Sequence, residues 1–166
     1  MTALRICLIG SDSHRWEDLL GVIQESFAYM DGVIDPPSSA HNLTADNLRE
    51  KAKDETGFAA FIGEKLVGCV FIKEKDDHFY LGKLAVAPGF EGQGIGRKLI
   101  EKAEQYTVAR GKPVMELQTR IELTRNHAVF GKLGYRKVAE TAHPGFTRIT
   151  SITMRKEITR GTDINA

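Results

Sequence analysis

Leu84-Ala-Val-Ala-Pro-Gly-Phe-Glu-Gly-Gln-Gly-Ile-Gly-Arg-Lys-Leu99 carries the clearest structural signal in this chain of 166 residues. The stretch joins the end of an apolar segment to a loop with glycine at positions 92, 94 and 96, and a helical pattern begins inside that loop. Glycine lets a ligand approach the backbone without a Cβ in the way. The free amides and the dipole of a helix start attract anions. The stretch therefore predicts a strand, an anion-binding loop and a helix.

Arg97 and Lys98 lie in the first turn of the predicted helix. Without a ligand, each cation there opposes the helix dipole by about 0.3–1 kcal/mol, so their presence favours a bound anion. The loop does not match either of two nucleotide-binding patterns. A Walker A loop requires Lys and then Ser or Thr after its last glycine, and the dinucleotide fingerprint needs a third glycine where this chain has Leu99. A nucleotide-binding loop and a plain glycine-rich turn stay open as alternatives.

The hydrophobic periodicity on both sides of this loop predicts a mixed α/β fold. We expect strands at 4–9, 58–62, 66–75, 79–86, 114–119, 135–141 and 148–157. Helices are expected at 15–30, from Thr44 to about Glu55, from the glycine loop to 110–113, and in a short segment ending at 133–134. Strand 66–75 is apolar on both faces, which indicates an interior position. We expect one domain over 1–158, followed by a tail at 159–166.

Composition and charge exclude several classes of protein. The formal net charge of +1 argues against a nucleic-acid partner bound through bulk charge. No segment approaches the ~18 apolar residues of a membrane span, and no signal peptide is evident, so we expect a cytoplasmic protein without a membrane partner. Cys7 and Cys69 lie in apolar stretches and are interpreted as small buried side chains. Neither a disulfide framework nor a metal site is predicted.

A second motif reads Asn126-His-Ala-Val-Phe-Gly-Lys-Leu-Gly-Tyr135. Residues 84–99 resemble motif A of the GNAT (GCN5-related) N-acetyltransferases, and residues 126–135 resemble motif B of that family. Each motif alone is only moderately specific for the family, but the two together, with one predicted strand between them, are specific for it. The resemblance implies an α/β fold with a mixed, mostly antiparallel twisted sheet of about seven strands and about four helices. It also implies that the fourth and fifth strands are splayed to admit a cofactor.

The resemblance further implies acetyl-coenzyme A as the co-substrate. The backbone of Leu84, Ala85 and Val86 is expected to pair with the pantetheine arm, and the Val86 amide is a candidate donor to the thioester carbonyl. Asn126 is expected to bond the cofactor, with a simple helix cap as the alternative. Phe130 is expected beside the thioester. The residues expected around the pyrophosphate are Glu91, Gly92, Gln93, Gly94, Ile95, Gly96 and Arg97.

The chain departs from the family pattern at three positions. Glu91 stands where Arg or Gln is usual, in a position that works mainly through its amide. Phe130 replaces the Tyr thought to protonate the departing thiolate in many members. Because a thiol has a pKa near 8.5, releasing a thiolate at pH 7 costs only about 2 kcal/mol. Tyr80 stands where histone-modifying members carry a catalytic Glu, and a neutral phenol cannot replace that base.

The expected activity is transfer of an acetyl group to a primary amine by direct attack in a ternary complex. A non-catalytic acyl-coenzyme A binding module is the alternative. Val86, Tyr80 and His127 are the candidate catalytic residues, and proton removal through water, His41 or Glu116 stays open. We expect the acceptor to enter over the loop 35–41. This loop has no acidic cluster, so the sequence does not favour polyamines or aminoglycosides as acceptors. The sequence leaves small-molecule and peptide acceptors, and monomer and homodimer, undecided.

Overall fold

The computed structural model describes residues 3–10 and 15–158, so the predicted tail at 159–166 lies outside the described residues. The strands are β1 (Leu4–Leu8), β2 (Thr56–Ile62), β3 (Lys65–Glu74), β4 (Phe79–Val86), β5 (Val114–Arg120), β6 (Arg136–Thr141) and β7 (Ser151–Glu157). The α-helices are α1 (Trp16–Phe27), α2 (Ala45–Asp54), α3 (Ile95–Ala109) and α4 (Thr124–Lys132), and two short 3₁₀ helices are η1 (Ala28–Met30) and η2 (Ser39–Asn42).

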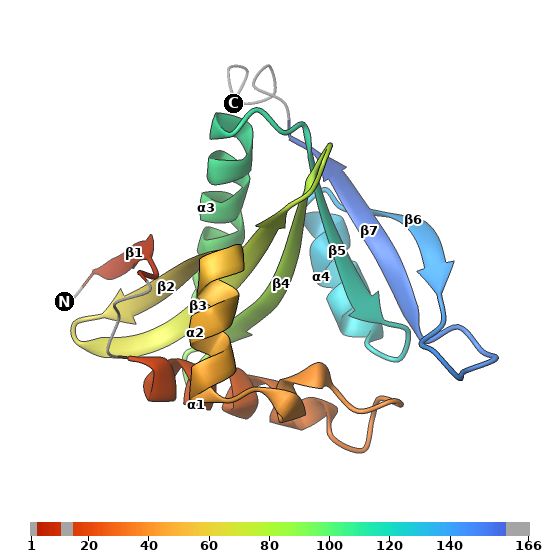
Figure 1. The fold of residues 1–166 in the computed structure, drawn as a ribbon, viewed down its shortest axis with the longest axis horizontal. Coiled ribbons are helices and arrows are strands. Elements are labelled where there is room, and N and C mark those ends of the chain that lie inside the picture. Colours follow the sequence, from red (N-terminus) through yellow and green to blue (C-terminus); the bar gives the residue numbers. More distant parts are fainter. Residues whose placement is uncertain (1–2, 11–14, 159–166) are drawn as a thin grey trace.

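The seven strands form one sheet in the order β1-β2-β3-β4-β5-β7-β6 (Figure 1). The β4–β5 pair is parallel and the other neighbouring pairs are antiparallel. This confirms the predicted mixed, mostly antiparallel sheet with four α-helices. The interior position expected for β3 is also confirmed, because β3 pairs with β2 and β4 and its residues 66–72 are buried.

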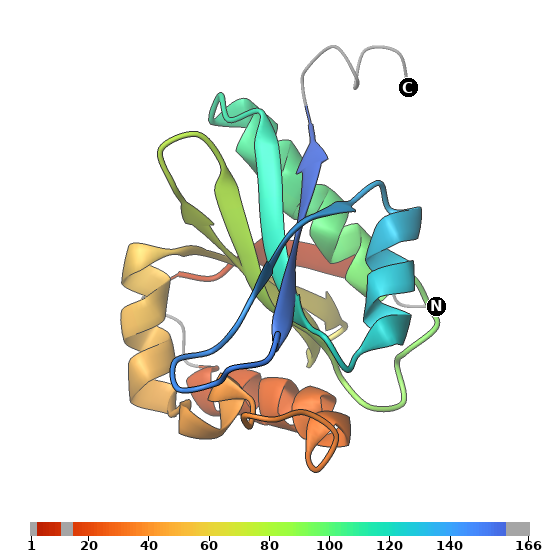
Figure 2. The same cartoon turned by 90° about the vertical axis from the view of Figure 1, so that its right-hand side faces the viewer.

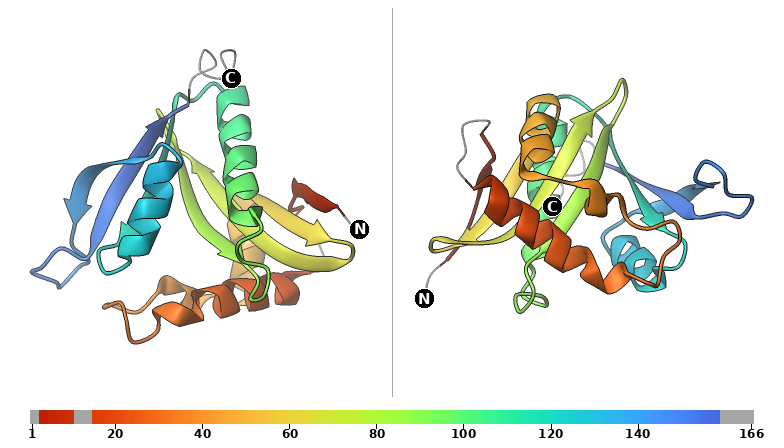
Figure 3. Two further views of the ribbon diagram at one scale, coloured as in Figure 1. Left: turned by 180° about the vertical axis from the view of Figure 1, so that it is seen from behind. Right: turned by 60° about the horizontal axis from the view of Figure 1, so that its bottom comes forward.

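Helices cover both faces of the sheet. Helices α1 and α2 pack through Trp16, Leu19, Ile23 and Leu48 on one face, and Ala59 of β2 belongs to that core. Its neighbours along β2, Phe58 and Ala60, belong to the other core, which α3 covers. The views from behind and from below show α3 and α1 on opposite sides of the strands (Figure 3). The alternation of side chains along a strand thus supplies both cores.

A glycine in β3 sets how closely α3 approaches the sheet. A Cβ at Gly68 would lie 2.8 Å from the carbonyl oxygen of Ala85 and 3.1 Å from the side chain of Leu99. Because the carbonyl belongs to the neighbouring strand, it cannot move away cheaply. Gly68 therefore lets the first turns of α3 lie close to β3 and β4.

Strands β4 and β5 separate after a short paired segment. Their parallel pairing is confined to Phe79–Leu81 on β4 and Met115–Leu117 on β5. Beyond this point Lys83 has a φ of +51°, and the β3–β4 register shifts between Cys69 and Phe71. This bulge bends β4 away from β5, and the two strands diverge as the arms of a V (Figure 1). Figure 2 shows the molecule from the side of β5, β7 and β6. The predicted splay between the fourth and fifth strands is confirmed.

Several predicted boundaries were wrong. The strand predicted at 148–157 begins at Ser151, because Arg148 lies in a loop and binds Asp35. The helix predicted at 15–30 ends at Phe27 and continues as η1.

Cys69 is buried as expected, but Cys7 is only partly buried because β1 is an edge strand. Within the described residues, no helix combines the length and apolarity needed to cross a membrane.

Candidate functional site

A cavity of about 830 Å³ lies where β4 and β5 diverge. Its wall includes parts of α1, η2, β4, β5, α3 and α4, together with the loop between β6 and β7. The predicted site residues Tyr80, Leu84, Gly96, Arg97, Asn126 and Phe130 line this cavity. It therefore joins the start of α3 to residues of α4 that lie about 30 positions further along the chain.

The glycine loop presents a helix N-terminus. Gly94 caps α3 with a φ of +81°, a conformation that favours glycine. The amide of Lys98 is bonded to the carbonyl of Gly94 at 3.0 Å, so the amides before it have no partner inside the helix. The Glu91 carboxylate accepts a hydrogen bond from the amide of Gly89 at 2.8 Å. Glu91 thus folds back on its own loop, which accommodates its departure from the usual residue type.

The amide of Val86, the candidate donor to a thioester carbonyl, points to α1 in this structure. It donates a hydrogen bond of 3.3 Å to the hydroxyl of Ser26, which lines the cavity. The amide is therefore directed away from the β3 ladder. Sequence reasoning missed Ser26, because a serine inside an amphipathic helix has no pattern that marks it.

Asn126 and Phe130 of α4, both indicated by the sequence, line the cavity with Val129 and Lys132. The side-chain amide of Asn126 donates to the hydroxyl of Tyr29 at 3.2 Å. The ring of Phe130 packs edge-on against Tyr135, with 6.1 Å between centroids. The Tyr135 hydroxyl donates to Glu104 at 2.9 Å, and burial raises the pKa of this phenol above its ordinary value. Tyr135 therefore offers no acid in place of the tyrosine missing at position 130.

The three groups named for proton removal besides water have other partners. His41 lies 2.7 Å from the Asp31 carboxylate and its side chain is more than half exposed. The Nε2 of His127 donates to the carbonyl of Arg120 at 2.9 Å. Glu116 accepts from Arg155 at 2.7 Å. None of the three lines the cavity.

Tyr80 does line the cavity, but as a phenol that holds its proton. Burial, aided by the charge of Glu116, raises the pKa of Tyr80 above its ordinary value. A phenol with a raised pKa is a hydrogen-bond donor at neutral pH rather than a base. The geometry places Tyr80 in the site, and its chemical role remains a prediction.

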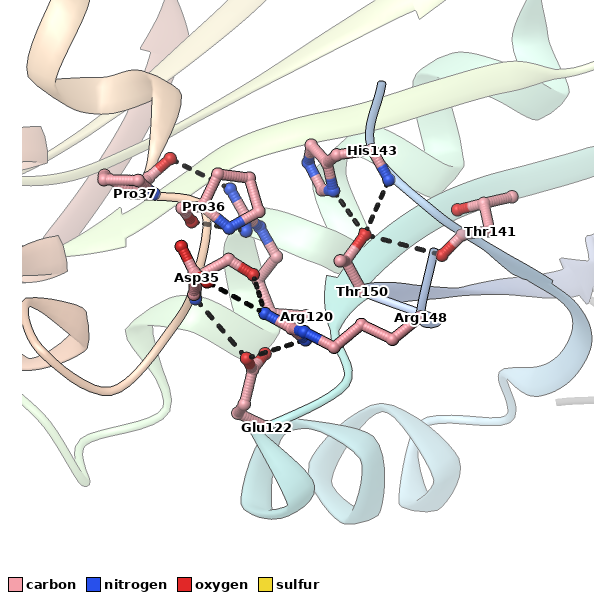
Figure 4. Close-up of polar contacts among 9 residues, drawn as sticks. All are labelled: Asp35, Pro36, Pro37, Arg120, Glu122, Thr141, His143, Arg148 and Thr150. Atoms are coloured by element: carbon pink, nitrogen blue, oxygen red, sulfur yellow. Dashed lines mark hydrogen bonds and ion pairs between the residues drawn. The ribbon is translucent and has the colours of Figure 1, made fainter. Parts of the chain in front are cut away.

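His143, a residue that sequence reasoning missed, lines the same cavity from the loop between β6 and β7. Its ring Nδ1 contacts the hydroxyl of Thr150, which also accepts from the His143 amide at 2.9 Å and reaches the Thr141 carbonyl (Figure 4). Because the hydroxyl has one proton, all three contacts are satisfied when Nδ1 donates and Nε2 keeps its lone pair. Burial and the charge of Arg120 lower the pKa of His143.

The loop at residues 35–37, beside the cavity, is tied to the C-terminal half of the chain (Figure 4). Arg120 donates to the carbonyls of Pro36 at 2.6 Å and Pro37 at 3.1 Å. Arg148 binds the carbonyl and the carboxylate of Asp35 at 2.9 and 3.1 Å. Glu122 accepts from the Asp35 amide at 3.4 Å and lies 3.7 Å from Arg148. These contacts hold residues 35–37 at one end of the cavity.

The bulge in β4 contributes a lysine and covers a cysteine. The Lys83 ammonium donates to the hydroxyl of Ser39 on η2 at 2.6 Å, and both residues line the cavity. Beneath it, the Cys69 thiol lies 3.5 Å from the Lys83 carbonyl. Full burial raises the pKa of this thiol to about 12, so Cys69 is not a thiolate at neutral pH. No group of three or more His, Cys, Asp or Glu side chains that could hold a metal occurs among residues 3–10 and 15–158.

Comparisons with known proteins agree with this arrangement. The model of the acetyltransferase (GNAT) family matches residues 16–135. A comparison with curated proteins found no match. Solved structures share the fold at low identity. The PaiA N-acetyltransferase of Thermoplasma acidophilum, solved in complex with coenzyme A, is 18% identical with a TM-score of 0.79, covering 93% of this chain and 99% of that one.

Two further similar structures are of enzymes whose names state different acceptors. The ribosomal-protein-S18-alanine N-acetyltransferase of Escherichia coli is 17% identical with a TM-score of 0.74, covering 95% of both chains. Aminoglycoside 6'-acetyltransferase type Ii is 19% identical with a TM-score of 0.74, covering 93% of this chain and 97% of that one. At such identities the likeness establishes the fold and leaves the acceptor open.

Proposed function

The chain belongs to the GNAT family of acetyltransferases, and we propose that it transfers the acetyl group of acetyl-coenzyme A to a primary amine of a small molecule. The observation that carries this proposal is the single cavity that reaches from Gly96 and Asn126 at one end to Ser39 and Lys83 at the other. One end has a helix N-terminus suited to phosphates, and the other is lined by Pro37 of the tied loop 35–37. Both reactants can therefore be held together in one site.

For the cofactor, we propose the residues that the family motifs indicate. The amides between Gly92 and Arg97 bind the pyrophosphate, since a helix N-terminus offers unpaired donors to anions. The backbone of Leu84–Val86 on the diverging end of β4 pairs with the pantetheine arm. Asn126 exchanges its bond to Tyr29 for a bond to the cofactor. The Val86 amide exchanges Ser26 for the thioester oxygen, where it stabilises the negative charge of the tetrahedral intermediate.

We propose direct attack by the neutral amine. The amine nitrogen bonds to the thioester carbon, the carbon–sulfur bond breaks, and coenzyme A leaves as a thiolate that takes a proton from water. Departure without an acid costs about 2 kcal/mol at pH 7 for a thiol of pKa near 8.5. Phe130 then serves as an apolar wall beside the thioester. The burial of Cys69 argues against a covalent acetyl-enzyme.

His143 is our proposed acceptor for the proton that the attacking amine loses. Its Nδ1 is held by Thr150, which leaves Nε2 as the basic atom, and its lowered pKa keeps the ring neutral at physiological pH. The tied loop 35–37 favours a small acceptor over a long peptide, because Arg120 and Arg148 fix that loop against the opposite side of the cavity.

Thiol release from acetyl-coenzyme A, measured against a panel of amines, amino acids and peptides, tests the proposal. We expect release with at least one small amine and initial-rate patterns of the sequential type. Ping-pong kinetics, or an acetylated enzyme in mass spectra after incubation with acetyl-coenzyme A alone, would contradict direct transfer. Stoichiometric binding of coenzyme A without thiol release for any amine would instead indicate a non-catalytic binding module.

A further inference from the structure

The charged residues on the cavity wall are all of one sign. In the part of the chain that the structure describes, the wall has no aspartate or glutamate, and its lysines and arginines are Lys51, Lys83, Arg97, Arg120 and Lys132. Arg97 and Lys132 lie on α3 and α4, at the end proposed for the cofactor. The other three come from α2, β4 and β5 and lie at the acceptor end. The cofactor phosphates therefore do not account for them.

Among these cations, Lys83 has the most unusual backbone conformation. Its backbone has a φ of +51°, which residues other than glycine rarely adopt. This bulge is where β4 leaves β5. Backbone strain of this kind concentrates at functional sites. Its Nζ is held 2.6 Å from the neutral hydroxyl of Ser39, and among the described residues no carboxylate lies within ion-pair distance of it.

Among the described residues, no neighbour forms an ion pair with Lys83. Lys51 is paired with Glu55 at 2.7 Å. Arg120 is bound to two peptide carbonyls, which satisfy its donors without neutralising it. Burial and the charges of Lys51 and Arg120 lower the pKa of Lys83, and the charge of Glu55 offsets this only in part. A half-buried cation that its surroundings oppose is stabilised by an anion brought by a ligand.

We infer that the acceptor amine carries an anionic group, a carboxylate or a phosphate ester, and that Lys83 binds this group while the amine faces the thioester. The inference rests on the proposed function and narrows it to one class of acceptors. Arg120 and Lys51 add positive potential without direct contact being required. The same charges repel an ammonium and so lower its pKa, which favours the neutral amine that attacks. Polyamines, with several cations and no anion, are poor substrates in this site.

Matched pairs of probes test the inference by binding, which is independent of turnover. Calorimetry on the protein saturated with coenzyme A compares each of the L-amino acids with its α-amide, and O-phosphoethanolamine with ethanolamine. We expect at least one anionic probe to bind about 10- to 100-fold more tightly than its neutral partner, as for a hydrogen bond to a charged group. The amino acids and the phosphate ester distinguish a carboxylate from a phosphate.

Three variants assign the effect to Lys83. Lys83→Met removes the charge and should abolish the preference, whereas Lys83→Arg should retain most of it. Both replacements carry the same Cβ into the bulge, so backbone strain affects them alike. Lys73→Met, an exposed lysine on β3, should leave the preference unchanged. Circular dichroism and coenzyme A affinity establish that the variants fold.

The outcomes separate the inference from the proposed function. Equal binding of anionic and neutral partners, no binding of any probe, or a preference that survives in Lys83→Met overturns the inference. Thiol release with neutral or polycationic amines but with no anionic amine also overturns it, while the proposed function stands. An anion preference that requires Lys83, in a protein that releases no thiol with any amine, upholds the anion site and refutes acetyl transfer.

Discussion

The side-chain amide of Asn126 lies 3.2 Å from the hydroxyl of Tyr29 and donates a hydrogen bond to it. This contact joins α4 to η1, two segments separated by 97 positions in the chain, at the wall of the cavity. The sequence indicated Asn126 as a cofactor ligand. Tyr29 accepts the hydrogen bond that we propose Asn126 donates to the cofactor.

Exchange of this partner predicts opposite effects for the two residues. Asn126→Ala should weaken coenzyme A binding by roughly tenfold, the value of one hydrogen bond. Tyr29→Phe removes the competing acceptor and should leave the affinity unchanged or raise it. Calorimetry with coenzyme A measures both. A similar loss in both variants would show that the pair closes the cavity as a unit and that Asn126 is not a ligand.

Gly96→Val should weaken coenzyme A binding by about tenfold or more, because the branched side chain occupies the space proposed for the phosphates. A Cβ at Gly96 meets only Val86, at 3.7 Å, so the fold should tolerate it. Gly21→Val on α1 is the control, since its Cβ meets nothing within 4 Å and Gly21 does not line the cavity. Gly94 is a poorer probe because its φ of +81° adds strain. Unchanged calorimetric affinity for Gly96→Val would refute the pyrophosphate assignment.

His143→Gln should lower kcat by about 10²–10⁴-fold, the usual contribution of a general base, with little change in coenzyme A affinity. His41→Gln and His127→Gln serve as controls and should keep kcat within a few-fold of the wild-type value, because neither residue lines the cavity. Steady-state rates at several pH values provide the measurement. If His127→Gln proved the damaging substitution, the sequence-based prediction for His127 would be restored and ours for His143 abandoned.

Cys69 should resist alkylation in the native protein. With a pKa of about 12, its thiolate fraction at pH 8 is on the order of 10⁻⁴. Iodoacetamide at pH 8 should therefore modify Cys69 only after denaturation, as peptide mass spectrometry would show. The partly exposed Cys7 provides an internal comparison. Rapid labelling of native Cys69 would reopen the question of a covalent intermediate.

Lys83→Met should raise the free energy of unfolding at pH 7 by about 1 kcal/mol, since it removes a half-buried charge that has no ion-pair partner among the described residues. A chain of this size would then unfold about 2–4 °C higher. The pKa of Lys83 is lowered on folding, so the unfolded state binds more protons and wild-type stability rises with pH. The advantage of the variant should therefore shrink as the pH approaches about 10.5, the ordinary lysine value. Thermal melts at pH 7 and 10 measure this, and a pH-independent difference would contradict the explanation.

Much of the fold was predictable because the signals are local. The apolar residues on both faces of the strand predicted at 66–75 mark an interior strand, and the glycines at 92, 94 and 96 mark a helix start that needs a left-handed residue. Boundaries were less reliable where a distant contact decides. Residues 148–150 have a strand-like composition, yet Arg148 turns away to bind Asp35, and that ion pair has no local signature.

The cofactor end of the site was indicated by contiguous motifs, whereas the acceptor end was not. Lys51, Lys83, Arg120 and His143 come from α2, β4, β5 and the loop between β6 and β7, and no spacing in the sequence connects them. Each reads as an ordinary surface residue when taken alone. Only the divergence of β4 and β5 brings them to one cavity.

The sequence by itself determined the sheet, the helices and the loop that offers amides to an anion, because periodicity and backbone freedom act over a few neighbouring residues. The tertiary structure decided which charged groups are paired and which are left without a partner. Glu116 is held by Arg155 and His127 by a carbonyl, while within residues 3–10 and 15–158 the Lys83 ammonium has a hydrogen bond to Ser39 and no ion pair. Electrostatic partners and burial depend on distances in space, and those are fixed only when the whole chain has folded.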